Sequence, residues 1–186
     1  VAFVHGRTIG NAAVAESPIE VSQQGSVVRV HRDVVGAMAP PFYTCLGKYT
    51  KPIHRWHTVN YHAPSICVIE VGCRALHEGD GLGEITGCVM HLATPETETS
   101  THYFWAFVRN FRQADEFLTR YIQEAVDATH NEDKVVVELQ QSALTPDECD
   151  NPVQTAIAVD SGPIRGRRVL QAMMADEQRE RAPALP

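Results

Sequence analysis

The sequence lacks long hydrophobic runs. No stretch approaches the roughly 20 consecutive apolar residues that a membrane-spanning helix needs, and the opening VAFVHGRTIG does not combine the basic and apolar regions of a signal peptide. We therefore expect a cytoplasmic protein with no membrane partner. With 186 residues, 44% of them hydrophobic, the chain can bury a core as one domain or as most of a larger one.

Basic residues are also scarce. The chain has 16 Lys and Arg against 23 Asp and Glu, which gives a formal net charge of −7. Binding to a nucleic-acid backbone requires clustered Lys and Arg side chains that neutralise phosphates. This charge balance therefore excludes nucleic acid as the expected partner.

The cysteines form no recognisable framework. Their number is odd, and their spacing matches neither a C-x-x-C zinc pattern nor the disulfide pattern of a small secreted domain. We expect reduced, mostly buried thiols at these positions, which are Cys45, Cys67, Cys73, Cys88 and Cys149.

Two common catalytic motifs are missing as well. The sequence contains no G-x-S-x-G nucleophile elbow and no glycine-rich phosphate loop that opens a helix. The stretch GDGLGE has the composition of such a loop, but it joins two predicted strands and is interpreted as a hairpin turn.

Alternating apolar and polar residues predict a series of strands. Residues 18–33 alternate around Gly25 and predict a hairpin, and residues 34–52, with Pro40, Pro41 and two glycines, are expected to form an irregular segment that walls a pocket. Short breaks separate the long strand-like runs that follow, and short connections favour an antiparallel meander. These runs cover residues 54–63, 65–76, 83–96 and 99–111.

The period of the sequence changes after the last predicted strand. Apolar residues recur at helical spacing over residues 114–144, which predicts one long helix, and residues 164–181 predict a second helix near the end of the chain. We therefore expect an α+β fold in which a curved antiparallel sheet packs on a long C-terminal helix. Such a helix-grip arrangement leaves a cavity suited to an apolar ligand.

Three histidines in one strand-like run superficially resemble a metal site. His54 and His57 face opposite sides of a strand, and His54 and His62 share a face but lie ~26 Å apart at about 3.3 Å per residue. We therefore expect no three-histidine metal site in this run.

Three other polar residues occupy positions that call for a partner. His5 follows Phe3 and Val4, and it is either a packed side chain or a ligand. Asp133 lies on or beside the apolar face of the long helix, where a carboxylate needs a cation or hydrogen-bond donors unless it reaches solvent. His91 can either point into the cavity and bond a polar ligand group or pack across strands.

Two stretches together, VAFVHGRTIG and HYFWAFVRNF…NEDKVVVELQQ, resemble the oxygenase components of Rieske non-haem iron aromatic ring-hydroxylating oxygenases, in particular the vanillate O-demethylase branch. That family holds its iron with two histidines spaced H-x-x-x-x-H and one carboxylate from a distant helix. The resemblance implies that His5 is the second histidine and that Asp133 is the carboxylate. It also implies that the first histidine immediately precedes Val1, and that Glu132 and Glu138 are flanking surface residues.

The resemblance further implies a START-like fold and the chemistry of a Rieske monooxygenase or demethylase, or of a ring-hydroxylating dioxygenase. Fe(II) activates O₂, with electrons from NADH or NADPH delivered through a reductase or ferredoxin and a [2Fe–2S] Rieske cluster in the neighbouring subunit of a homotrimer. The substrate is an aromatic acid, and O-demethylation releases formaldehyde. His91 matches a position that contacts a polar group of the substrate, and no catalytic residue beyond the metal ligands is expected.

The sequence departs from the family in two respects. It contains no C-x-H…C-x-x-H pair to hold a Rieske cluster, and it lacks the upstream aspartate that links cluster to iron in the family. We therefore expect residues 1–186 to be the C-terminal part of the catalytic domain, without its Rieske domain and inactive alone. The alternative function is a metal-free helix-grip module that binds an apolar small molecule, and convergence of His5 with Asp133 discriminates between the two readings.

Overall fold

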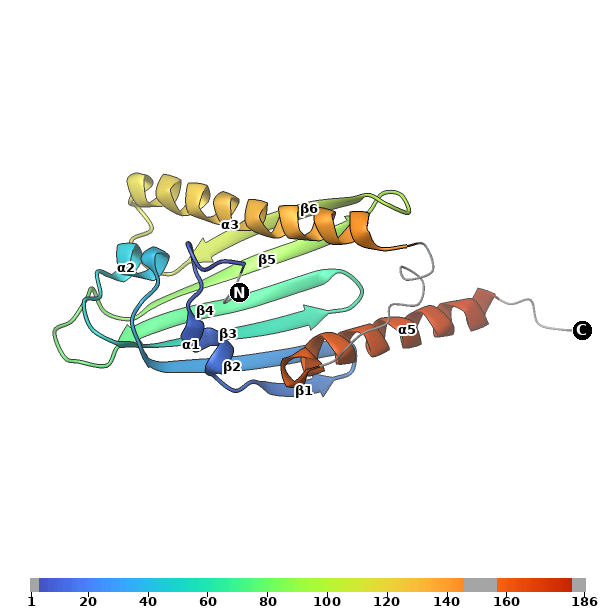
Figure 1. The fold of residues 1–186 in the computed structure, drawn as a ribbon, viewed down its shortest axis with the longest axis horizontal. Coiled ribbons are helices and arrows are strands. Elements are labelled where there is room, and N and C mark those ends of the chain that lie inside the picture. The colour runs from blue at the N-terminus through green and yellow to red at the C-terminus, as the bar shows by residue number, and fades with distance from the viewer. Residues whose placement is uncertain (1–3, 146–156, 182–186) are drawn as a thin grey trace, which may run out of the picture.

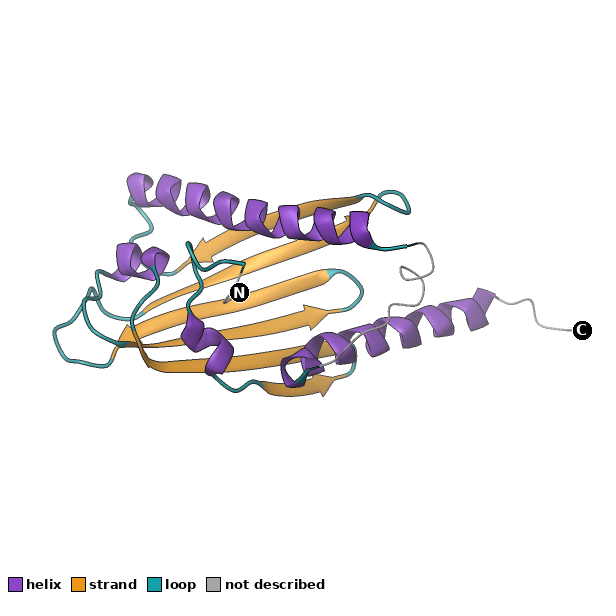
Figure 2. Cartoon of the chain, in the orientation of Figure 1, coloured by secondary structure: helices purple, strands orange, loops and turns teal. Residues whose placement is uncertain are grey.

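The computed structural model describes residues 4–145 and 157–181, and its centre is one antiparallel sheet (Figures 1 and 2). Each of the six strands pairs with the next strand along the chain, so the sheet is the predicted meander. The strands are β1 Glu20–Gln24, β2 Val27–Ala37, β3 Ile53–His62, β4 Ile66–Ala75, β5 Ile85–Pro95 and β6 Thr101–Arg109.

Two long helices accompany the sheet and confirm the predicted α+β class. Helix α3 lies along the β5–β6 half of the sheet and α5 along the β1–β2 half (Figure 1). In the described part of the chain, neither helix is long and apolar enough to cross a membrane. The helical segments are α1 Ala12–Glu16, α2 Pro41–Gly47, α3 Glu116–Ala143, the 3₁₀ turn η1 Ala158–Asp160, and α5 Ser161–Arg181.

Both long helices contact the same face of the sheet. The α carbon of Gly162 in α5 lies against Val30, so closely that a methyl group there would overlap the valine side chain. Strand register and the alternation of side chains put Val30 on the same face as His91, which contacts α3. On the opposite face, Phe104 and Val108 of β6 are exposed.

The hydrophobic core fills the space between the sheet and the N-terminal half of α3. Helix α3 begins after Asp115, whose side chain accepts a hydrogen bond from the backbone N–H of Leu118 and so caps the helix. The core cluster comprises Phe42, Tyr43, Leu46, Tyr49, Ile53, Cys73, Ile85, Leu118, Ile122 and Val126.

The prediction of an irregular segment over residues 34–52 was wrong in part, because residues 34–37 continue strand β2 and residues 41–47 form helix α2. Pro41 occupies the first turn, where its fixed φ suits a helix and its missing N–H has no intrahelical acceptor to lose. Burial of Phe42, Tyr43 and Leu46 in the core then stabilises a helix too short to form alone.

The histidines of β3 face opposite sides of the sheet, as predicted. His57 pairs across strands with Arg32, and burial together with the charges of Arg55 and Arg32 lowers its pKa to about 3. His54 points the other way, and its Nε2 lies 2.6 Å from Oδ1 of Asp33. These side chains therefore form no common metal site.

The cysteines in the described part of the chain are free thiols, as predicted. Cys73 is fully buried, and burial raises its pKa to about 11. Cys45, Cys67 and Cys88 are partly buried, and Cys149 lies outside the described residues. A thiol with a raised pKa stays protonated, so Cys73 is a packing residue.

Candidate functional site

The N-terminal loop and α3 meet at His5, which is only 5% exposed. Its Nε2 lies 3.1 Å from Oδ1 of Asp133, and its Nδ1 lies 2.9 Å from Oε2 of Glu132. The Thr8 hydroxyl donates to the same Glu132 oxygen at 3.0 Å. The structure thus brings His5 and Asp133 together across the fold, as the sequence analysis expected.

The pattern of α3 explains why two consecutive carboxylates reach one histidine. The buried stripe of the helix runs through Ile122, Val126 and Thr129. Glu132 and Asp133 follow Thr129 by three and four residues, and both spacings continue the same face of a helix. The two carboxylates therefore flank the end of the buried stripe.

A tight turn fixes the other side of the site. The backbone N–H groups of Thr8 and Gly10 both donate to the carbonyl of His5, at 3.1 and 2.8 Å. Arg55, which is buried and stacks on the Tyr43 ring, donates through Nη1 to the carbonyl of Ile9 at 2.7 Å. The loop that carries His5 is thereby attached to the sheet.

The carboxylates of Glu132 and Asp133 favour positive charge at His5, either as a proton on its ring or as a bound metal ion. The hydrogen bond with Asp133 raises the pKa of His5 despite burial, and the hydrogen bond with Glu132 raises it further. Burial opposes ionisation of Asp133, but the hydrogen bond and charge of His5 still lower the pKa of its carboxyl group. Because both ring nitrogens face a carboxylate oxygen, either a proton or a metal ion is favoured between Nε2 and Asp133.

The expectation that Glu132 is a flanking surface residue was wrong. Its carboxylate is partly buried and bonds both His5 and Thr8. Glu138, in contrast, is an exposed residue whose Oε1 lies 3.7 Å from Nζ of Lys134. The position of Glu132 on the helix allowed it either to be exposed or to contact another segment. The path of the N-terminal loop, which brings His5 and Thr8 to Glu132, decides for contact.

A second polar cluster lies where α3 faces β5 and β6. His91 Nδ1 is 2.8 Å from the Tyr103 hydroxyl, and His91 Nε2 is 3.2 Å from Nε2 of His130. The Trp105 ring lies 5.2 Å from the His130 ring. The His91 ring therefore lies between helix and sheet, where it contacts Tyr103 of the next strand and His130 of α3, neither of which the sequence analysis named.

The donor set at His5 suits part of a metal site. Two ligand atoms that each lie about 2.1 Å from a metal ion at a right angle are ~3 Å apart, which matches the 3.1 Å between His5 Nε2 and Asp133 Oδ1. A histidine ligand commonly donates its other N–H to a carboxylate, and Glu132 occupies that position. Within the described ranges, no group of three or more His, Cys, Asp and Glu residues could hold a metal ion.

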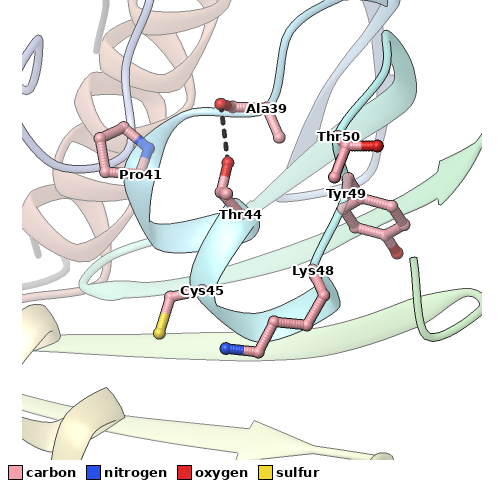
Figure 3. A pocket seen from close by; sticks show the side chains of 7 residues that line it. All are labelled: Ala39, Pro41, Thr44, Cys45, Lys48, Tyr49 and Thr50. Carbon is pink, nitrogen blue, oxygen red and sulfur yellow. Dashed lines mark hydrogen bonds between the residues drawn. The ribbon is translucent and has the colours of Figure 1, made fainter. Parts of the chain in front are cut away.

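One open hollow lies elsewhere on the molecule. It has a volume of about 710 Å³ and is lined by residues of α2 and its flanks, including Cys45, Lys48 and Tyr49 (Figure 3). The segment of residues 34–52 thus lines a pocket, as predicted, but neither His5 nor Asp133 belongs to its lining. We therefore assign the candidate site to the His5 region.

Curated oxygenase components are similar to nearly the whole chain. The chain is 29% identical over 185 residues to a vanillate O-demethylase oxygenase subunit of Pseudomonas sp. (strain ATCC 19151), covering 95% of this chain and 56% of that protein. It is 29% identical over 194 residues to the oxygenase component of chloroacetanilide N-alkylformylase of Rhizorhabdus wittichii (strain DC-6 / KACC 16600), covering 100% of this chain and 53% of that protein.

A solved structure shares the fold. Dicamba monooxygenase bound to 3,6-dichlorosalicylic acid superimposes with a TM-score of 0.84 at 21% identity, over 95% of this chain and 52% of that one. The chain therefore spans about half the length of the proteins it matches. Residues 1–176 match the family model of the vanillate O-demethylase oxygenase C-terminal domain, and the chain belongs to that family.

Proposed function

We propose that this chain is the mononuclear-iron portion of a Rieske-type oxygenase that hydroxylates or O-demethylates an aromatic acid. The observation that carries the proposal is the approach of His5 Nε2 to Asp133 Oδ1, at 3.1 Å, from two segments far apart in the sequence, the N-terminal loop and α3. An imidazole and a carboxylate are two of the three ligand types of the two-histidine, one-carboxylate sites that activate O₂. Membership of the vanillate O-demethylase oxygenase C-terminal domain family supports the same reading.

The residues of this chain would have distinct tasks at the iron. His5 and Asp133 would hold Fe(II), which would supply O₂ activation when bound. Glu132 accepts a hydrogen bond from His5 Nδ1–H, and this contact fixes the tautomer of His5 so that Nε2 keeps a lone pair toward the metal. Thr8 holds the Glu132 carboxylate in place.

The substrate would lie between α3 and the sheet. His91, His130 and Tyr103 supply polar groups there, and Trp105 supplies an aromatic surface. Two relatives are named for vanillate and for toluene-4-sulfonate, and each of these compounds is an aromatic ring bearing an acidic oxygen group. We propose the same class of substrate here, with His91 in the group that recognises its polar end.

The remaining partners follow from the same proposal. A [2Fe–2S] Rieske cluster in another part of the whole protein would pass electrons from NAD(P)H, through a reductase or ferredoxin component, to the iron. Relatives named as an oxygenase component and as an iron–sulfur subunit support this division of labour. We place the assembly in the cytoplasm as a homotrimer.

The alternative is a metal-free module that uses the same fold to bind an apolar small molecule. A binding module has no use for a buried imidazole directed at two carboxylates, and this arrangement favours the oxygenase. A third possibility, that the chain is a purely structural interaction domain, explains neither His5 nor Asp133.

The decisive experiment uses the full-length gene product with a reductase. We expect stoichiometric iron and NAD(P)H-dependent release of formaldehyde from vanillate or another methoxylated aromatic acid, with a hydroxylated product from an acid that lacks the methoxy group. Protein without iron that nevertheless binds these compounds would support the metal-free module instead.

A further inference from the structure

Tyr103, His91 and His130 form a continuous hydrogen-bonded chain beside the candidate iron site, here called the Tyr–His–His chain. Its contacts run from the Tyr103 hydroxyl to His91 Nδ1 at 2.8 Å and from His91 Nε2 to His130 Nε2 at 3.2 Å. His130 precedes Asp133 by three residues and lies on the same side of α3. Both ring nitrogens of His91 are therefore engaged, and neither is free to meet a ligand directly.

The number of hydrogens in the Tyr–His–His chain limits what it can offer. A phenol and two neutral imidazoles carry three polar hydrogens in total. Two of them lie within the two internal hydrogen bonds. The third must point outward, from the Tyr103 hydroxyl at one end or from His130 Nδ1 at the other.

The surroundings of the two ends decide between these arrangements. His130 Nδ1 is buried and has no hydrogen-bond partner in the structure, whereas Tyr103 is 45% exposed. A buried N–H without an acceptor is rarer in proteins than an acceptor that lacks a donor. His130 Nδ1 is therefore the bare lone pair. His130 Nε2–H donates to His91 Nε2, His91 Nδ1–H donates to the Tyr103 oxygen, and the Tyr103 O–H remains free.

We propose that the Tyr103 hydroxyl is the donor that contacts the substrate, and that His91 and His130 are positioning residues that direct this donor outward. The ligand class is an aromatic compound that carries an anionic oxygen acceptor, such as a carboxylate. Each hydrogen bond received polarises the next donor in the chain, so a charged acceptor gains most. This inference rests on the proposed function and names the group that selects its substrate.

The role of His130 gives the proposal a sharp test. Replacing His130 with leucine removes the donor to His91 Nε2, so His91 can carry its hydrogen on Nε2 and accept at Nδ1. The Tyr103 O–H then turns inward to His91 and is lost to the ligand, although Tyr103 itself is unchanged. Glutamine places an amide N–H near the position of His130 Nε2, so His130→Gln should preserve the outward donor.

The experiment measures the dissociation constants of two matched probes for the full-length protein by calorimetry. 4-Methoxybenzoate carries a carboxylate where 4-methylanisole carries a methyl group. We expect Tyr103→Phe and His130→Leu each to raise the dissociation constant for 4-methoxybenzoate about tenfold. This is the contribution of one hydrogen bond to a charged group. Neither change should alter the affinity for 4-methylanisole, His130→Gln should bind both probes as the wild type does, and iron content should stay constant.

Several outcomes would overturn the proposal. The first is a wild-type protein that does not bind 4-methoxybenzoate more tightly than 4-methylanisole. The second is a Tyr103→Phe change that lowers the affinity for both probes equally or for neither. The third is a His130→Gln variant with the same affinities as His130→Leu. If the full-length protein shows no iron-dependent reaction but its variants show the expected affinities, the proposed function is wrong and the role of Tyr103 as a hydrogen-bond donor to the ligand is still supported.

Discussion

Replacing Asp133 with alanine in the full-length protein is expected to abolish both iron retention and oxygenation. Asp133 supplies the negative charge that faces His5 Nε2 at 3.1 Å, and no other carboxylate contacts that nitrogen in the described part of the chain. Without it, Fe(II) loses its charged ligand, and iron should fall from about one ion per protomer to background. Elemental analysis after gel filtration in the presence of a weak chelator measures this loss.

Two companion variants separate loss of charge from damage to the helix. Asp133→Asn keeps the shape of the side chain but removes its charge, so it should also lose most of its iron. Glu138→Ala is the matched control, because Glu138 is an exposed carboxylate on the same helix and forms an ion pair with Lys134. Full iron content and activity in Asp133→Ala would show that this carboxylate is not a ligand.

Replacing Glu132 with glutamine is expected to weaken iron binding by about 10- to 100-fold, the usual effect of altering a residue that orients a metal ligand. The amide oxygen can still accept from His5 Nδ1, 2.9 Å away in the wild type, but it no longer makes the ring more basic by its charge. Thr8→Val, which removes the hydroxyl that holds Glu132, should have the same sign and a smaller effect. Competition with a chelator of known affinity gives the iron dissociation constant.

Glu138→Gln is the control for this series, since it removes an equal charge from an exposed position of the same helix. Thermal unfolding of the iron-free variants shows whether the fold itself has changed. Equal iron affinities for Glu132→Gln and Glu138→Gln would mean that Glu132 contacts His5 without affecting how strongly His5 binds iron.

The sheet and both long helices followed from local patterns in the sequence. The strand period breaks at proline or at glycine-rich turns, and short connections left few alternatives to an antiparallel meander. Helix α2 was missed because Pro40 and Pro41 are typical of irregular segments, although Pro41 suits the first turn of a helix. Its formation depends on Phe42 and Leu46 reaching a core that distant strands complete.

The candidate site was predictable only in part, because its contacts join segments far apart in the chain. The family resemblance suggested His5 and Asp133 as metal ligands. No local pattern indicated whether Glu132 or solvent would accept a hydrogen bond from the second ring nitrogen of His5. His91 was expected either to point into the cavity or to pack across strands, and its ring contacts both Tyr103 of the next strand and His130 of α3. Its contact with His130 depends on how α3 lies along β5 and β6, which no pattern in a single sequence specifies.

The central claim is that His5 and Asp133 bind iron, and the most direct test is a crystal structure of the full-length protein measured at the iron absorption edge. We predict an anomalous-difference peak within bonding distance, about 2.0–2.2 Å, of both His5 Nε2 and Asp133 Oδ1. An iron peak at another site, or a fully iron-loaded crystal in which His5 still bonds Asp133 directly, would contradict the account.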